Sequence, residues 1–370
     1  MKKVKLGEVC EIRIGKTPNR SQTLYWGGDY PWLSISDMKG KILCTTKEKI
    51  TQEAVQKEKM QIVSKGTVVM SFKLSIGKVG ILAENMYTNE AIANFVVKNN
   101  KMLFNEYLYY ALQGMNFDSL TDRAVMGKTL NKAKLNNLSI VYNEPFMQQQ
   151  IVLRLDGVNK LIESRKQQLS ELSKLVKSRF NEIFGDPVLN EMGWEKHALK
   201  EFGIWKSGGT PKRNEEKYFR GRIPWITSGE LEHKYIDDSF EKITEKAIES
   251  SSAKIIEKGS LLLGMYDTAG LKSSINTKVM SCNQAIAFAK LDDKITNTIY
   301  VYYVIQNLRS MLLNQQRGVR QKNFNLSMIK NISIPLPPLS LQNEFADFVT
   351  QVDKSQLAIQ KSLEELETLK

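Results

Sequence analysis

The feature that most constrains this chain is a long internal repeat. The Gly-Lys-Thr-Pro segment at 15–18 returns as Gly-Gly-Thr-Pro at 208–211, and Pro-Trp-Leu at 31–33 returns as Pro-Trp-Ile at 224–226, both 193 positions later. A solenoid unit is only about 20–50 residues long, so the sequence predicts a tandem duplication of one domain together with its connector. Further matches, at offsets of 193 or 194, pair 50–51 with 243–244, 65–66 with 258–259, 89–93 with 283–287 and 138–140 with 332–334.

The two copies share structural residues and differ in polar ones. The shared positions are mostly Gly, Pro, Trp and aliphatic residues, which set turns and cores. Between them, Ser-Ile-Ser-Asp-Met at 34–38 faces Thr-Ser-Gly-Glu-Leu at 227–231, and the Lys that ends 68–73 faces the Tyr that ends 261–266. One scaffold with two polar surfaces indicates two related modules that recognise different targets. Neutral drift of loops is the alternative.

Composition favours a nucleic-acid partner inside the cell. The 370 residues include 53 Lys and Arg against 40 Asp and Glu, a formal charge of +13, and such a cationic surface attracts nucleic acid ahead of an anionic membrane. A basic protein without such a partner is the alternative. The N-terminus has no signal-peptide pattern, and no stretch approaches the roughly 18 apolar residues of a membrane span. Three unpaired cysteines suit a reducing compartment, so a cytoplasmic protein is expected.

Each half shows strand patterns followed by a helix. Strands are predicted at 66–72, 78–82 and 91–97, with copies at 261–265 and 285–289, and helices at 105–113 and 298–313. The tyrosine pairs at 109–110 and 302–303 match across the repeat. We interpret them as packing residues of these helices, with base stacking as the alternative.

A long helix with a heptad pattern is expected after each module, from 147 to 184 and from about 341 to 370. Two such helices most simply form an antiparallel pair; the alternative is that each packs on its own module. At a 1.5 Å rise per residue they are about 45–57 Å long, more than one DNA turn of about 34–36 Å, and would act as a ruler. The predicted seam residues are Ile151, Leu155, Val158, Ile162, Leu169, Leu172 and Val176 in the first helix and Phe345, Val349, Val352, Ile359, Leu363 and Leu366 in the second.

These patterns predict an α+β protein with four parts. Two tandem α/β modules occupy 1–145 and 186–338. Two spacer helices, at 146–185 and 339–370, join them and form an antiparallel coiled coil.

The sequence shows no pattern for catalysis, a cofactor or a metal. The two histidines, His197 and His233, have no metal-ligand spacing and make a histidine triad implausible. The Gly-Lys-Thr segments at 15–17 and 127–129 lack the upstream glycine of a phosphate loop, and we interpret both as turns. The segment 142–146 (Tyr-Asn-Glu-Pro-Phe) has Glu where the tetrapeptide of an amine methyltransferase requires Pro.

Binding chemistry is better represented. Arg and Lys hold phosphates and read guanine edges, and basic stretches recur at matching places before each exit strand and after each Thr-Pro turn. A generic solvated patch is the alternative. The residues predicted to face DNA are Arg123, Lys128, Arg317, Arg320 and Lys322 in the first pair of stretches, Lys16, Arg20, Lys212 and Arg213 in the turns, and Ser34, Ser36, Lys73, Thr227, Ser228 and Tyr266 as base contacts.

In this order, twice over, these segments resemble the specificity subunit of type I restriction-modification systems. The marks are the Gly-x-Thr-Pro turn, the Pro-Trp-Leu/Ile element, the Lys-Gly strand start, the Asn-Glu/Gln-Ala-Ile-Ala segment and the Pro-rich exit at 332–339 followed by Gln342. The resemblance covers essentially the whole chain.

The resemblance implies a non-catalytic subunit that recognises double-stranded DNA. Each module would be a target recognition domain for one half of a split, asymmetric site. The helices would form the spacer and dock two copies of a methyltransferase subunit, and restriction and motor subunits would join them. The methyltransferase would bind S-adenosylmethionine and methylate a flipped adenine, so this chain would need no cofactor.

Two alternatives remain open, and the chain departs from the family pattern twice. A coiled-coil scaffold with non-specific DNA affinity, or a self-contained methyltransferase or nuclease, would also be basic. The first exit, at 141–145, lacks the Pro-rich pattern, so its strand-to-helix turn is expected to differ from the second. The second helix has no counterpart of 177–187, which indicates a shorter spacer end or a truncated form.

Overall fold

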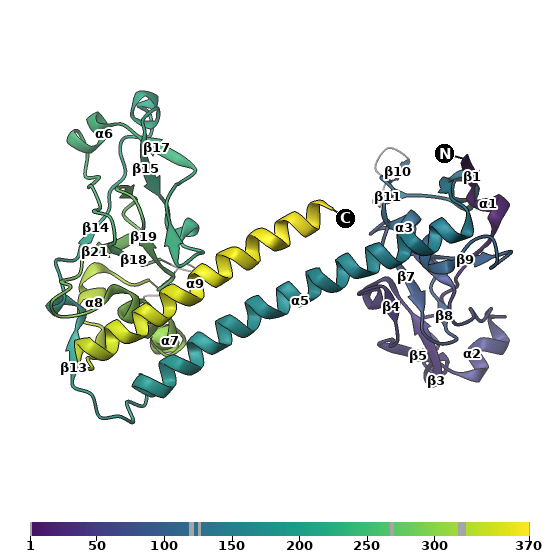
Figure 1. Ribbon diagram of the computed structural model, residues 1–370, viewed down its shortest axis with the longest axis horizontal. Coiled ribbons are helices and arrows are strands. Elements are labelled where there is room, and N and C mark those ends of the chain that lie inside the picture. Colours follow the sequence, from purple (N-terminus) through teal and green to yellow (C-terminus); the bar gives the residue numbers. More distant parts are fainter. Residues whose placement is uncertain (1, 118–121, 125–126, 267–269, 317–322, 370) are drawn as a thin grey trace. The chain divides into compact units, whose positions relative to one another are not determined.

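The computed structural model describes residues 2–117, 122–124, 127–266, 270–316 and 323–369 (Figure 1). Two compact units divide the chain, one formed mainly by Met1–Ile162 and the other by Glu163–Thr368. Each unit contains one copy of the repeat. The long helix α5, Pro145–Phe184, contributes to both units.

The first module is built on two sheets. A five-stranded sheet has the order β2-β9-β6-β7-β4, and a three-stranded sheet has the order β5-β3-β8. A short pair, β1-β12, joins the start of the module to its exit. The elements are β1 Lys2–Lys5, α1 Leu6–Val9, β2 Cys10–Ile14, β3 Trp26–Leu33, β4 Ile42–Leu43, β5 Glu48–Ile50, α2 Gln52–Lys57, β6 Val68–Ser71, β7 Val79–Leu82, β8 Tyr87–Thr88, β9 Ile92–Val97, α3 Asn105–Gln113, β10 Asp122–Ala124, β11 Gly127–Thr129, α4 Lys132–Asn137 and β12 Ser139–Tyr142.

The second module repeats this topology. Its sheets have the orders β14-β21-β18-β19-β16 and β17-β15-β20, and β13-β22 closes the module as β1-β12 closes the first. The predicted duplication is therefore confirmed at the level of strand pairing. The elements are β13 Lys196–Ala198, β14 Lys206–Ser207, β15 Ile223–Ile226, β16 Tyr235–Ile236, β17 Glu241–Ile243, α6 Glu245–Glu249, β18 Leu261–Gly264, β19 Ser273–Asn276, β20 Ser281–Cys282, β21 Ile286–Ala289, α7 Thr298–Gln316, α8 Leu326–Lys330, β22 Ser333–Pro335 and α9 Leu339–Thr368.

The five-stranded sheet of each module is buried on both faces, which explains its near-continuous apolar strands. Along β6, Val68 and Met70 face a core shared with α3, whereas Val69 faces a second core toward the three-stranded sheet. Alternation along a strand sends neighbouring side chains to opposite faces. Tyr109 and Tyr110 are buried in the α3 core, as predicted.

One turn prediction was wrong. Residues 127–129 form β11, which pairs antiparallel with β10 and places Arg123 opposite Lys128. A Gly-Lys-Thr triplet carries no periodicity from which a three-residue strand could be recognised. The first basic stretch is thus a hairpin, and the structure describes only the backbone of its strands.

The two long helices form the predicted antiparallel pair (Figure 1). Arg179 of α5 donates a 2.7 Å hydrogen bond to Glu344 of α9, and Lys166 forms a 3.0 Å ion pair with Glu367. As residue numbers fall along α5 the partner numbers rise along α9, so the helices run in opposite directions. No described helix is long and apolar enough to cross a lipid bilayer.

The predicted seam serves two purposes rather than one. Ile151 and Leu155 pack against the core of the first module, while Phe345, Val349 and Val352 belong to the core of the second. The alternative, in which each helix packs on its own module, is therefore correct for the first turns of each helix. Further along, Ile162, Val176 and Leu363 are buried, and Val158, Leu169, Leu172, Ile359 and Leu366 are half-buried.

The two strand-to-helix exits are alike, although the sequence predicted a difference. The buried Gln148 donates to the carbonyl oxygens of Asn143 and Met102, each at 2.7 Å. Its counterpart Gln342 donates to the carbonyl of Pro337 at 2.8 Å and accepts from Thr296 at 2.9 Å. The glutamine amide holds the same turn whether or not prolines surround it.

Candidate nucleic-acid interface

The turn after the first Thr-Pro pair is held against aromatic side chains. The guanidinium carbon of Arg20 lies 3.9 Å from the ring centroid of Trp26 and 4.9 Å from that of Trp32. Both terminal nitrogens of Arg20 donate to the carboxylate of Glu48, and this hydrogen bonding lowers the pKa of Glu48. The indole N–H of Trp32 donates to the carbonyl of Lys16 at 3.1 Å.

The second module repeats this arrangement residue by residue. The guanidinium carbon of Arg213 lies 4.7 Å from the ring centroid of Phe219 and 4.8 Å from that of Trp225. Arg213 donates to Glu241 at 2.6 Å, and Trp225 donates to the carbonyl of Gly209 at 3.0 Å. We call this set of contacts, from Arg20 in one module and Arg213 in the other, the arginine clip.

The arginine clip shows which basic side chains of the two turns already have partners within the protein. The sequence predicts Arg20 and Arg213 as DNA-facing residues, and in the structure each guanidinium pairs with one carboxylate of its own module. Lys16 is also partnered, through its 2.8 Å ion pair with Glu58, whereas the side chain of Lys212 is exposed. The contribution of these turns to DNA binding stays a prediction.

Two of the predicted base-contacting hydroxyls cap short helical turns. The hydroxyl of Ser34 donates to Asp37 at 2.7 Å, and that of Thr227 donates to Glu230 at 2.8 Å. Such side chain–backbone and side chain–side chain bonds shape the turn that follows each Pro-Trp strand. Ser36 is exposed and lies 2.8 Å, oxygen to oxygen, from Ser34, and Ser228 is half-buried.

Several predicted segments of the first module meet around the end of β6. Lys78 immediately precedes β7, and its carbonyl accepts from the amide of Ser71 at the end of β6 at 2.9 Å. Its ammonium donates to the carbonyl of Ile35 in the capped turn at 3.4 Å. The amide of Leu130, which follows the basic hairpin, donates to the carbonyl of Phe72 at 3.0 Å. Lys73 follows Phe72, so the hairpin, Lys73 and the turn at 34–37 adjoin one another.

The second module has a matching but incompletely described region. The amide of Phe324 donates to the carbonyl of Met265 at 2.7 Å, next to the partly exposed Tyr266. The predicted residues Arg317, Arg320 and Lys322 lie outside the described residues. In the part of the chain that the structure covers, no three His, Cys, Asp or Glu side chains are grouped as a metal site requires.

Sequence reasoning missed the acidic partners of the arginine clip. Glu48 and Glu241 were available as a signal, because Glu-Lys-Ile recurs at 48–50 and 241–243 in the same register as the arginines. Two oppositely charged residues that recur together in both copies indicate a contact.

The fold and the repeated site together define a class of proteins with two α+β modules, each followed by a long connecting helix. Residues 1–174 and 191–368 each match the model of the type I restriction modification DNA specificity domain. The chain belongs to this family. Both matches include the arginine clip of their module.

Several curated relatives are similar to parts of the chain. The MjaIX specificity subunit of Methanocaldococcus jannaschii is 26% identical over 185 residues, which cover 48% of this chain and 43% of the relative. The EcoR124I/EcoR124II specificity subunit of Escherichia coli is 26% identical over 222 residues, which cover 56% and 52%. The chain thus spans about half the length of these relatives.

Solved structures share the fold over the full chain. The S subunit of a type I restriction-modification system from M. genitalium gives a TM-score of 0.63 at 14% identity, covering 100% of this chain and 93% of that one. A chain from a type I R-M system, solved to explain complex assembly and conformational transition, gives 0.62 at 15% identity and covers 100% and 95%. At such identities the likeness concerns the fold.

Proposed function

We propose that this chain is the non-catalytic DNA-recognition subunit of a type I restriction-modification complex. Each module recognises one half of a bipartite, asymmetric site in double-stranded DNA. The observation that carries the proposal is the duplicated module, with the same strand order in its two main sheets and diverged polar residues around the ends of β6 and β18. Two scaffolds of one topology with different side chains at one place suit the recognition of two different short sequences.

The spacer helices set the unread gap between the half-sites. At a 1.5 Å rise per residue, the 40 residues of α5 give a continuous rod of about 60 Å. The helix is anchored by Ile151 and Leu155 in the first module and by Val176 in the second. A helix anchored at both ends resists bending better than a loop of equal length.

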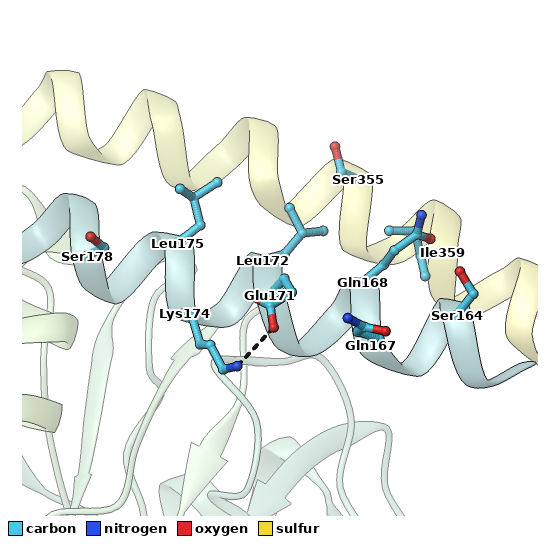
Figure 2. A pocket seen from close by; sticks show the side chains of 10 residues that line it. All are labelled: Ser164, Gln167, Gln168, Glu171, Leu172, Lys174, Leu175, Ser178, Ser355 and Ile359. Atoms are coloured by element: carbon cyan, nitrogen blue, oxygen red, sulfur yellow. Dashed lines mark hydrogen bonds and ion pairs between the residues drawn. The ribbon is translucent and has the colours of Figure 1, made fainter.

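The exposed faces of the helix pair dock the methyltransferase. A groove of about 820 Å³ runs along α5 and α9. Figure 2 shows that Leu172 and Leu175 of α5 point toward α9 in this groove. Leu175 is 49% exposed, so it offers apolar surface to a partner. The remaining lining residues are Ser164, Gln167, Gln168, Glu171, Lys174, Ser178, Ser355 and Ile359.

The partners supply the chemistry. Two methyltransferase subunits bind S-adenosylmethionine and methylate adenine, and restriction and motor subunits complete the complex. This chain then needs no cofactor and acts in the cytoplasm, where its DNA lies. Titration of the purified chain with S-adenosylmethionine checks this assignment, and saturable binding by the chain alone would favour the self-contained methyltransferase.

The test of the function is a genome-wide map of adenine methylation in the native host, with and without this gene. Loss of one motif, consisting of two short elements that flank a fixed gap, is the expected result. If the map does not change, selection from a randomised duplex library with the purified chain distinguishes a sequence-recognition subunit from a scaffold with non-specific DNA affinity. If the selection enriches no bipartite sequence, the result would favour the scaffold alternative.

Docking is tested by co-purification with the methyltransferase subunit. Leu175→Lys places a charge in the groove and should abolish co-purification without changing the helical content. Leu189→Lys is the matched control, because Leu189 is 67% exposed and lies outside both helices. Equal co-purification of both variants with the methyltransferase would contradict the docking site.

A further inference from the structure

A lysine occupies the same structural position in both modules. Lys41 precedes β4 and Lys234 precedes β16, and the two positions are related by the repeat. The backbone amide of Ile81 donates to the carbonyl of Lys41 at 2.7 Å, and that of Ile275 donates to the carbonyl of Lys234 at 2.7 Å. The edge of each five-stranded sheet therefore fixes the backbone from which the lysine extends.

In the first module, the lysine connects the sheet to α3 and α5. The ammonium of Lys41 lies 4.8 Å from the ring centroid of Tyr110 and donates to the carboxylate of Asp156 on α5. The hydroxyl of Tyr110 also donates to Asp156 and accepts from Asn159 at 2.9 Å. Burial and the bond to Asp156 raise the pKa of Tyr110, so its hydroxyl remains a donor.

In the second module, the corresponding lysine connects the sheet to α7 and α9. The ammonium of Lys234 lies 5.4 Å from the ring centroid of Tyr303 and donates to Asp353 of α9 at 2.5 Å. The hydroxyl of Tyr235 donates to the same carboxylate at 3.1 Å. The side chains of Lys234 and Asp353 are only 15% and 21% exposed, so this ion pair is better shielded from solvent than that of Lys41 and Asp156, whose side chains are 23% and 44% exposed.

The carboxylate occupies different helical positions in the two copies. In the register of the repeat, Asp353 aligns with Asn159, and Asp156 aligns with Thr350. Residues three apart lie on the same face of a helix, so either position can meet the lysine. The contact recurs although its acidic residue has moved by one turn, which indicates that the contact matters more than the residue that makes it.

We propose that these two lysine–aspartate–tyrosine clusters orient each recognition module on its own spacer helix. Apolar contacts such as those of Leu155 and Val349 hold module and helix together, but hydrophobic burial is non-directional. A partly buried ion pair with a hydrogen-bonded tyrosine fixes the orientation of the module on its helix. A rotation would separate donors from acceptors and leave polar groups without hydrogen bonds, which costs free energy. Lys41 and Lys234 are thus positioning residues, and their role in DNA recognition rests on the proposed function.

The test is the distance distribution between two spin labels within one unit of the full chain, measured by double electron–electron resonance. Labels at Lys246→Cys and Lys361→Cys report on the second module and α9, since both positions are exposed and lie away from the cluster. Cys44→Ser removes the exposed native thiol, whereas Cys10 and Cys282 are buried. A matching pair at exposed positions on α2 and α5, Lys57→Cys and Lys160→Cys, serves the first unit.

Lys234→Met should replace the single narrow peak of the parent chain with a broad distribution, and Lys41→Met should do the same in the first unit. Lys242→Met is the matched control, because it breaks an ion pair with Asp238 that is exposed to solvent. Distributions that stay narrow in both cluster variants would overturn the proposal, even if the variants are less stable. A purely stabilising contact would lower stability without broadening the distance.

Moving the carboxylate provides the rescue. Asp353→Asn should broaden the distribution, and adding Thr350→Asp should restore it, because this pair of changes copies the first module. Asp156→Asn combined with Asn159→Asp is the reciprocal exchange. Failure of both double variants to narrow the distribution would contradict the positional equivalence on which the proposal depends.

A second measurement separates this proposal from the proposed function. With a randomised duplex library, the parent chain should enrich one gap length, and Lys234→Met should enrich several. If no variant enriches any bipartite sequence while the spin-label distances respond as expected, the orienting role stands and DNA recognition fails. An unchanged single gap in a chain whose distances have broadened would refute the link between them.

Discussion

At the scale of single residues, charged groups that suggest DNA contacts are used inside the protein. Arg20 and Arg213 each stack on two aromatic rings and bind a glutamate of their own module. Gln148 and Gln342 are fully buried and satisfy their amides at the helix starts. These side chains act on function by shaping turns.

Replacing Arg213 tests whether the arginine clip stabilises the second module. Arg213→Met should lower the free energy of unfolding by about 1 kcal/mol, the combined scale of an exposed cation–π contact and an exposed ion pair. Urea unfolding measures this, with Lys212→Met as the exposed neighbouring control. Unchanged stability combined with a smaller salt dependence of DNA binding would instead make Arg213 a phosphate ligand.

The cluster of the first module predicts a dependence on pH. Burial opposes the ionisation of Asp156, but hydrogen bonds from Lys41 and Tyr110 outweigh it and lower the pKa of the carboxyl below its usual value. A depressed pKa stabilises the folded state above the unfolded pKa, and this stability is lost as pH falls through the folded value.

The stability difference between the parent chain and Asp156→Asn should therefore be constant above about pH 5 and shrink in more acidic solution. Urea unfolding at a series of pH values measures it. Glu163→Gln, an exposed change on the same helix, is the control. A difference that does not depend on pH would show that charge is not what Asp156 contributes.

At the scale of elements, the two long helices carry cores as well as a seam. Phe345 of α9 is completely buried and contacts Phe180 and Phe184 of α5, both with ring centroids 5.5 Å away. Tyr303 of α7 adds a ring at 5.3 Å. This aromatic cluster binds the helix pair to the second module, so the helices and the module should unfold together.

Phe345→Ala should lower the free energy of unfolding by about 3–5 kcal/mol, because it leaves a cavity among the rings of Phe180, Phe184 and Tyr303. Leu357→Ala on the same helix should change it by less than about 0.5 kcal/mol, since Leu357 is 59% exposed. Near-equal losses from the two variants would mean that α9 is not packed as described. Circular dichroism during urea unfolding measures both.

At the scale of the whole molecule, each module is expected to act on its own half of the DNA site. Replacing Arg317 and Arg320 with alanine should weaken binding through the second half-site only. Binding to duplexes in which one half-site is scrambled measures this separately for each half. Equal loss at both halves would contradict the two-module arrangement.

The net charge of +13 predicts a steep response to salt. If the modules contact several phosphates, the logarithm of the binding constant should fall with the logarithm of salt concentration by about 0.9 per phosphate contact. Titrations at a series of salt concentrations give this slope. A shallow slope without sequence preference is what the scaffold alternative predicts.

The duplication, strands such as Val68–Ser71 and the two long helices could all be predicted from the sequence alone. These depend on local periodicity and on residues that recur at one offset, both of which are visible in one dimension. It also indicated the antiparallel pairing, because two heptad patterns in one chain have few other ways to bury their apolar faces.

The pairing of charged residues with one another, in contrast, depends on the three-dimensional fold. Lys41 and Asp156 are 115 positions apart, and Arg20 and Glu48 are 28 apart, so no local pattern connects them. The sequence likewise does not show whether Ile151 packs against a helix or against its module, because an apolar side chain is buried favourably in either contact. Hydrophobic burial is non-directional and specifies that a residue is covered, whereas the fold specifies what covers it.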